Sequence, residues 1–307
     1  MKATESSVRG RFRRRLSDVS YFSARRSNGC IVFRRVAAGQ VKRGSRWARG
    51  IGGLAAACLF LVPLALMVLG SLRPVGLPPP RGLDLSAGVS AASYAQVSDS
   101  IDFARYSLNS LMVAALTVPL SVLFASWAGF AISRMSRKGA GALISISVAA
   151  LMVPVTALLV GRFSVFKMLG VIDTWVPLVA FALIGMSPIY VLIYAWAFSR
   201  IPAELVDAAR LEGLGTLGIW RRVGMPLVRP VTAGVATMAF VLSWGDFTSP
   251  LIYLFNERIY TLPLGLRELA SLPSPMTPTM LAGAVMATLP VLIAMVVGQR
   301  WAVSRAR

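Results

Sequence analysis

Hydrophobic residues in this chain gather into long runs that are separated by short polar segments. The first run, residues 51–72, carries no charge and is long enough to cross a hydrocarbon core of roughly 30 Å. Five further runs follow it at residues 106–132, 142–160, 175–198, 231–255 and 279–298. The alternating pattern of a transmembrane β-barrel is absent, and backbone groups in lipid must be hydrogen-bonded internally. The pattern therefore predicts six membrane-spanning α-helices.

The composition is that of a chain whose solvent is a lipid bilayer. Hydrophobic residues make up 56% of the chain and charged residues only 14%. A soluble domain carries about 25% charged residues, because its surface must face water. We therefore predict an all-α integral membrane protein with six transmembrane helices.

Positive charge is distributed unevenly along the chain, whose net charge is +20. Residues 1–49 hold 14 Lys and Arg against two acids, Glu5 and Asp18. The segments that six spans place on the side of the N-terminus hold 25 Lys and Arg, and the segments on the other side hold seven. Basic residues concentrate on the cytoplasmic side of membrane proteins, so both termini are predicted to be cytoplasmic.

The basic arm at residues 1–49 has more than one reading. A basic segment directly before a hydrophobic span is typical of a cytoplasmic anchor that faces anionic lipid head groups. It can also be an unstructured tail whose charge only sets the topology. RNA binding is a further reading of a basic segment. Because the charge is concentrated before a span, we expect membrane lipid and no nucleic acid as a partner.

These features divide the chain into four parts. A basic cytoplasmic arm at residues 1–49, expected to be disordered, precedes the first transmembrane helix and an external loop at 50–105. The core, 106–298, holds five transmembrane helices and includes a cytoplasmic loop at 199–230. A short cytoplasmic tail follows at 299–307.

Several kinds of chemistry are excluded by what the chain lacks. It has no histidine, which removes His-based catalysis and His metal ligation together. It has no G-x-x-x-x-G-K-[ST] string, so it carries no phosphate-binding loop of its own. Cys30 lies in the basic arm and Cys58 in the first apolar run, so no disulfide framework is implied. We expect no catalytic residue and no metal site.

The cytoplasmic loop at 199–230 contains a short amphipathic helix. Pro202 suits the first helical turn, and Glu204 and Asp207 complement the positive end of the helix dipole. Gly213 can adopt a positive φ and end the helix. One face is small and mostly apolar, with residues at i, i+3, i+4 and i+7: Leu205, Ala208, Ala209 and Glu212. Such a face can dock a partner protein or lie on lipid head groups, and the pattern alone leaves both open.

The spacing within this loop carries a family resemblance. The chain reads Asp207-Ala208-Ala209, then Glu212-Gly213-Leu214, and after eight further residues Val223-Gly224-Met225-Pro226. This segment resembles the EAA signature of ABC importer permeases, E-A-A-x-x-D-G-A followed by eight residues and I-x-L-P. The departures from the signature are conservative, except that Leu214 is bulkier than the Ala of the family.

Further strings extend the resemblance over residues 105–307. They are Asn109–Leu111, Ala128–Ala131, Gly170–Thr174, Ser243–Phe247 with Pro250-Leu251, and Thr261–Leu266. Together they are similar to carbohydrate-type permeases, and in particular to the second, six-span permease subunit of maltose-type sugar transporters. The resemblance implies the type I ABC importer permease fold and the import of a sugar or oligosaccharide.

The resemblance also implies a mechanism and a set of partners. The loop helix would insert into a cleft of an ATPase subunit and couple ATPase closure to alternating access. The docking residues would be Glu204, Asp207, Ala208, Ala209, Glu212, Gly213 and Pro226. The partners would be a second permease subunit in a heterodimer, two copies of an ABC ATPase, and an extracytoplasmic solute-binding protein. ATP and magnesium would act in the ATPase, so this chain, in the plasma or inner membrane, is expected to be no enzyme and to hold no cofactor.

Asp246 is the most unusual residue within the predicted spans. A carboxylate at that depth is costly and normally faces the bundle interior or water. Its neighbours Trp244 and Phe247 suit contact with sugar rings, so these three residues are candidates for a substrate pathway. Alternatively, Asp246 caps a helix break before Pro250 or bonds the partner permease. Asp173, at the start of the fourth span, is expected to be a helix N-cap.

The sequence disfavours one competing class of transporter and leaves other substrates of an ABC permease open. A secondary transporter would be expected to show internal repeats or several charges within the spans, and neither is found. Permeases for a polyol, a glycerol-phosphate or another small solute share the loop signature and stay open. Substrate identity, and direct contact of this chain with the substrate, are not fixed by the sequence.

Overall fold

The computed structural model describes residues 22–27, 30–35, 44–75, 88–183, 187–271 and 277–303. The chain forms two compact units, Met1–Pro63 and Leu64–Arg307, whose boundary falls inside helix α2 (Gly44–Ser71). Helix α2 begins within the basic arm, ahead of the apolar run that predicted it.

The first unit contains a β-hairpin that the sequence analysis missed. Strands β1 (Phe22–Ser27) and β2 (Cys30–Arg35) pair antiparallel, with Ser27 opposite Cys30. The two strands are joined by the dipeptide Asn28-Gly29, which favours a two-residue hairpin turn, and β2 is rich in residues that favour strands. The all-α prediction is confirmed for the other described elements, and this hairpin is an exception to it. The expectation of disorder for residues 1–21 and 36–43 falls outside the described residues.

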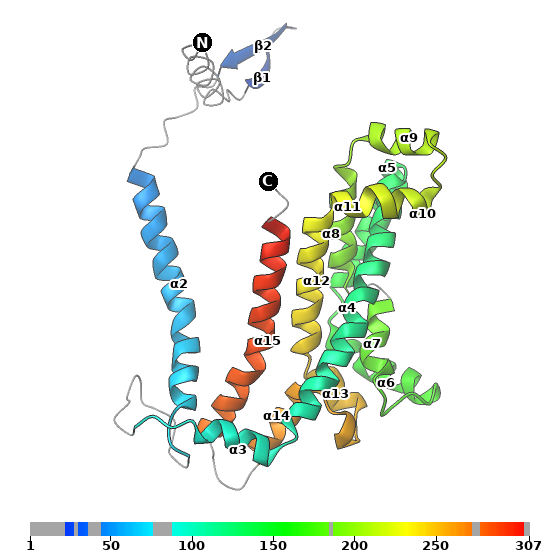
Figure 1. Ribbon diagram of the computed structural model, residues 1–307. Coiled ribbons are helices and arrows are strands. Elements are labelled where there is room, and N and C mark those ends of the chain that lie inside the picture. Colours follow the sequence, from blue (N-terminus) through cyan, green and yellow to red (C-terminus); the bar gives the residue numbers. More distant parts are fainter. Residues whose placement is uncertain are drawn as a thin grey trace, which may run out of the picture. The chain divides into compact units, whose positions relative to one another are not determined.

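The described residues of the second unit form helices and their connections. Helix α4 (Phe103–Arg134) is central and packs against α5, α7, α8, α12 and α14, and α12 also packs against α15 (Figure 1). The bounds of these partners are Arg137–Leu151 for α5, Val176–Leu183 for α7, Pro188–Ser199 for α8, Arg229–Trp244 for α12, Leu262–Ala270 for α14 and Thr277–Val303 for α15. Short elements complete the unit: α3 (Ala92–Ser100), η1 (Val155–Leu158), α6 (Leu159–Met168), α9 (Ala203–Leu211), α10 (Thr216–Ile219), η2 (Trp220–Gly224), α11 (Met225–Leu227), α13 (Thr248–Tyr253) and η3 (Glu257–Ile259).

Several described helices are suited to a membrane. Helices Phe103–Arg134 and Thr277–Ala302 are each long and apolar enough to cross one, and the number rises to five if each of three bent helix pairs is one span. Ala57–Ser71, in α2, is a shorter apolar helix. The chain is therefore a multi-pass membrane protein.

Three of the predicted runs are not single straight helices. The run at 142–160 bends by 83° between α5 and the η1–α6 segment, because Pro154 disfavours helical geometry in the residue before it. The run at 175–198 is divided between α7 and α8, with Pro188 in the first turn of α8. The run at 231–255 ends as a helix at Trp244, and residues 245–247 separate α12 from α13.

Glycine allows the closest approach between the two most extensively packed helices. A Cβ atom at Gly129 of α4 would lie 2.5 Å from Tyr194 Cβ and 2.8 Å from the Ala195 amide nitrogen of α8. Both neighbours are fixed by the α8 backbone and cannot move aside. Any side chain at Gly129 therefore has to separate α4 from α8.

Buried side chains gather at both ends of the second unit. At the α9 end, Phe130, Tyr194 and Phe198 form a cluster with Val206 and Ala209 of α9. At the α14 end, where α3, α13 and α14 lie (Figure 1), one cluster surrounds Trp244 and Leu262 and another surrounds Tyr253 and Leu254. The helices between the two ends leave many large apolar side chains exposed, as lipid-facing helices do.

Candidate functional site

Helix α9 lies across the end of the helix bundle instead of continuing a span. It makes an angle of 80° with α8 (Figure 1). Pro202 is the N-cap residue and has an extended backbone, with φ −53° and ψ 138°, which ends α8 and redirects the chain. The helix that the sequence predicted in this loop is therefore present, and it projects a surface away from the bundle.

The C-terminus of α9 is closed by a Schellman motif. Gly213 has a φ of +82°, its N–H donates to the Arg210 carbonyl oxygen at 2.9 Å, and the Leu214 N–H donates to the Ala209 oxygen at 3.1 Å. Leu214 packs against the same apolar cluster that holds Ala209, which is the hydrophobic contact typical of this motif. Gly213 thus has the role that the sequence predicted for it.

The free face of α9 differs from the predicted docking face at Ala209. Val206 and Ala209 are 4% and 5% exposed and pack toward α4 and α8. Ala209 therefore supports the helix from below and does not lie on its free surface with Ala208. The predicted docking residues that do lie on the exposed surface are Glu204, Asp207, Ala208, Glu212 and Gly213.

Two leucines near this surface were not singled out from the sequence. Leu211 is 91% exposed at the end of α9, and Leu217 is 62% exposed on α10. Large apolar side chains outside a membrane span are normally covered by protein or lipid. Together with Leu205, which is 47% exposed, they make the free surface of the loop more apolar than the alanines suggest.

The segment that joins the loop to α12 is a π-helix. In η2 the N–H of Met225 donates to the carbonyl of Trp220, five residues back. The next residue, Pro226, has no N–H, and its ring would clash with a carbonyl four residues back in a regular α-helix. Gly224 is buried here, and a Cβ atom on it would come within 3.1 Å of the Phe198 ring. Pro226 is half-buried, so its role is in this turn rather than on the free face of α9.

The three candidate pathway residues do not form one surface. Trp244 is 5% exposed, stacks on Phe240 and donates from its indole N–H to the Ala287 carbonyl at 3.0 Å, so it is part of the core between α12 and α15. Asp246 is half-buried, and its Oδ1 accepts from the Ser249 N–H at 3.1 Å. That bond is the helix-capping alternative considered for Asp246. Phe247 is 37% exposed.

Asp173 has a different role from the predicted N-cap. Its Oδ1 accepts two backbone hydrogen bonds, from Phe255 at 2.8 Å and Asn256 at 2.9 Å, and its own N–H donates to the Tyr253 oxygen at 2.9 Å. Asp173 also has a φ of +60°, a left-handed conformation that aspartate tolerates better than most residues. The carboxylate therefore clamps the segment after α13 from a position far away in the sequence.

Three more side chains fix the same segment. Asn109 Nδ2 donates to the carbonyls of Arg258 and Tyr260, and Trp175 Nε1 donates to the carbonyl of Ile259. Ser110 Oγ accepts from the Leu262 N–H at 2.8 Å and so caps α14 from another helix. The irregular backbone between α13 and α14 is thus held by side chains of α4 and of the turn before α7.

A polar pocket of about 320 Å³ lies between α13 and α14. Phe255, Tyr260, Arg267 and Glu268 are among its lining residues. Burial, followed by repulsion from Glu257, raises the pKa of the Glu268 carboxyl, while its hydrogen bond with the Tyr106 hydroxyl acts in the opposite direction. No group of three or more Cys, Asp or Glu side chains that could hold a metal ion occurs in the described part of the chain.

Comparison with known proteins shows that the chain is similar to inner membrane components of transport systems. A family model described as "Binding-protein-dependent transport system inner membrane component" matches residues 118–307. The chain is 28% identical over 251 residues to the arabinooligosaccharides transport system permease protein AraQ of Bacillus subtilis (strain 168), covering 80% of this chain and 88% of that protein. It is 26% identical to the maltodextrin transport system permease protein MdxG of the same organism, covering 76% and 84%.

A solved structure has the same fold. It is the crystal structure of a bacterial ABC transporter involved in the import of the acidic polysaccharide alginate, and one of its chains matches with a TM-score of 0.69 at 20% identity. The match covers 85% of this chain and 98% of that one.

Proposed function

Because the chain belongs to the family of binding-protein-dependent transport system inner membrane components, we propose that it is a permease subunit of an ABC importer for a sugar or oligosaccharide. The named relatives transport arabinooligosaccharides and maltodextrin, and they are matched over most of their length. The observation that carries the proposal is the free face of α9, which combines the family spacing with exposed acidic and apolar side chains.

The mechanism we propose uses α9 as a lever between an ATPase and the membrane helices. The exposed face, with Glu204, Ala208 and Leu211, docks into the ATPase. The opposite face, with Val206 and Ala209, is packed into the cluster that also contains side chains of α4, α8 and α12. A displacement of α9 is therefore transmitted by close packing to three helices at once, because packed interiors are hardly compressible.

The proposed topology has six spans with both termini in the cytoplasm. It rests on the 25 basic residues on one side against seven on the other, and on the apolar helices described above. In this arrangement α9 lies in the cytoplasm, and the segment between α13 and α14 lies outside. In chain order, the six proposed spans are α2, α4, α5, the α7–α8 pair, α12 and α15.

The proposed assembly contains a second permease, two ATPase subunits and an extracytoplasmic solute-binding protein. A solved alginate transporter in complex with a pentasaccharide-bound periplasmic protein supports the last of these partners. ATP and magnesium belong to the ATPase in this proposal, and the chain itself catalyses no reaction. Of the pathway candidates, we retain exposed Phe247 and half-buried Asp246, whereas the burial of Trp244 favours a structural role.

The docking proposal is tested by charge substitution of an exposed leucine. Leu211→Arg places a cation on the free face of α9. The control, Leu227→Arg, places a cation at a half-exposed leucine of α11, outside that face but at the same end of the bundle. Co-purification with a tagged ATPase subunit and ATP-dependent uptake of labelled oligosaccharides into proteoliposomes are measured for both variants. We expect Leu211→Arg to lose both and Leu227→Arg to keep both. Equal ATPase association in the two variants would overturn α9 docking, and uptake of no sugar by the intact complex would overturn the substrate class.

A further inference from the structure

An apolar groove of about 570 Å³ lies between α12 and α15 at the α9 end of the second unit. This volume is within the range of roughly 300–1,000 Å³ found for small-molecule sites. Its walls are formed by short side chains on the facing helices, among them Ala233, Ala236 and Ala294. The helices touch where Gly298 meets the side chain of Thr237, and the alanines beside this contact are too short to fill the remaining space.

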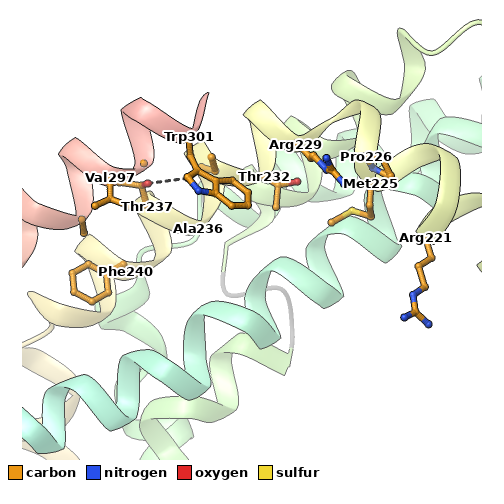
Figure 2. A pocket seen from close by; sticks show the side chains of 13 residues that line it. Arg221, Met225, Pro226, Arg229, Thr232, Ala236, Thr237, Phe240, Val297 and Trp301 are labelled. Carbon is orange, nitrogen blue, oxygen red and sulfur yellow. Dashed lines mark hydrogen bonds between the residues drawn. The ribbon is translucent and has the colours of Figure 1, made fainter. Parts of the chain in front are cut away.

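The groove has an apolar end and a basic end. Figure 2 shows the lining residues in a row from Phe240 through Thr237 to Thr232 and then to Arg229, with Arg221 beyond them and its side chain extending away from the row. Among the described residues that line the groove, none is acidic. Both arginines are exposed, and within the described residues neither forms an ion pair or a side-chain hydrogen bond. Two cations that line one end of an apolar groove favour an anion that carries a hydrocarbon chain.

The surroundings of the groove identify the source of that anion as lipid. Val297 lines the groove and is 54% exposed, and Leu292, Ile293 and Val296 of the same helix are also exposed. Trp301, which lies between Thr237 and Thr232 in Figure 2, is 61% exposed, in keeping with the preference of tryptophan for the membrane–water interface. A free phosphate would make no use of the apolar walls. A lipid acyl chain would bury them.

We propose that the α12–α15 groove binds an anionic phospholipid, with one acyl chain against Ala233, Ala236 and Phe240 and the phosphate beside Arg229, at the end of the groove that Arg221 also lines. Basic pockets between transmembrane helices on the cytoplasmic side bind acidic head groups in this way. The site adjoins Met225 and Pro226, which connect the loop to α12, so a bound lipid would brace the base of the coupling segment. This inference does not depend on which solute the protein carries.

The test is titration of the delipidated full-length chain with dioleoyl phosphatidylglycerol, followed by native mass spectrometry. Dioleoyl phosphatidylcholine and inorganic phosphate serve as the neutral-lipid and free-anion probes. We expect phosphatidylglycerol to bind more tightly than phosphatidylcholine, and the double variant Arg221→Gln/Arg229→Gln to weaken it about 30-fold, as expected for the loss of two cations near a membrane surface. The matched control is Arg137→Gln/Lys138→Gln, which removes two exposed cations from the N-terminus of α5, outside the groove.

A second variant separates the acyl chain from the head group. Ala236→Leu fills the apolar wall while both arginines stay in place, and it should also weaken phosphatidylglycerol binding. Equal effects of the groove and control double variants would reduce the site to general surface charge and overturn the proposal. Competition by inorganic phosphate, or a groove closed to lipid in the assembled transporter because a partner helix fills it, would overturn it as well.

Discussion

The α9 end and the α14 end of the second unit are held together by different forces. At the α9 end, apolar contacts of Val206 and Ala209 with aromatic side chains hold a helix whose other face is free. At the α14 end, Asp173, Asn109 and Trp175 hold an irregular segment by hydrogen bonds to its backbone. Apolar packing is non-directional and leaves a regular helix able to move as a unit, whereas hydrogen bonds fix each backbone group in place. The difference fits a lever at one end and a fixed frame at the other.

The largest effect on stability is expected where a glycine of α4 lies against the backbone of α8. Gly129→Ala pushes a Cβ atom against the backbone of α8, and overpacking of this kind costs about 1–3 kcal/mol. Thermal unfolding in detergent measures the loss. Gly141→Ala in α5 is the matched control, because a Cβ atom there meets nothing within 4 Å and alanine favours helix. Equal melting temperatures for the two variants would contradict close packing as the force that joins α4 to α8.

The next effect concerns the hydrogen-bonded frame. Asp173→Ala leaves the N–H groups of Phe255 and Asn256 without their acceptor, and we expect a loss of about 1–3 kcal/mol. Limited proteolysis should then cut the segment between α13 and α14 faster than in the parent. Asp173→Asn retains an acceptor oxygen and tolerates the positive φ, so it should behave like the parent. Cleavage of both variants at the parental rate would show that the clamp is dispensable.

A smaller effect on stability is expected at the turn that ends α9. Gly213→Ala forces a side chain into the left-handed region, at a cost of about 1–2 kcal/mol. Gly215→Ala, where φ is −69° and ψ is 170°, is the matched control. Because the strain lies beside the free face, Gly213→Ala should lose most of its ATP-dependent uptake while its unfolding temperature falls only slightly. Gly215→Ala should keep both at the parental values. Uptake at the parental rate in Gly213→Ala would show that the turn at Gly213 is not needed to couple the ATPase to transport.

The smallest effect on stability is expected on the free face itself. Asp207 and Arg210 form an ion pair at 3.3 Å, and both side chains are more than 60% exposed. Such pairs contribute less than about 1 kcal/mol, so Asp207→Ala should unfold at the parental temperature. ATPase co-purification should nevertheless decrease, since the carboxylate lies on the proposed docking surface. A large fall in stability would mean that this face is structural and would weaken the comparison between the two ends.

Local signals in the sequence predicted where the helices lie along the chain better than they predicted which residues contact each other. The uncharged runs located α4 and α15, and Pro202 and Gly213 marked the limits of α9. The burial of Ala209 was not predictable from its helix alone, because the aromatic residues that cover it come from α4 and α8. The sequence around Asp173 indicates an N-cap, whereas its hydrogen-bond partners lie 80 or more positions away, where a local pattern gives no signal. The Asn28-Gly29 dipeptide was a usable hairpin signal that the basic charge of the arm obscured.

The π-helix between the loop and α12 has a consequence for the length of the chain. A π-turn contains one residue more than the α-helix would place there. Deleting any one residue of 220–224 would require regular α-helical winding here, and the Pro226 ring would then clash with the carbonyl four residues before it. A kink would relieve this clash, and it would change the direction of the acidic and leucine side chains of α9 relative to α12. Descendants of this gene can therefore accept substitutions in this segment far more readily than a change in its number of residues.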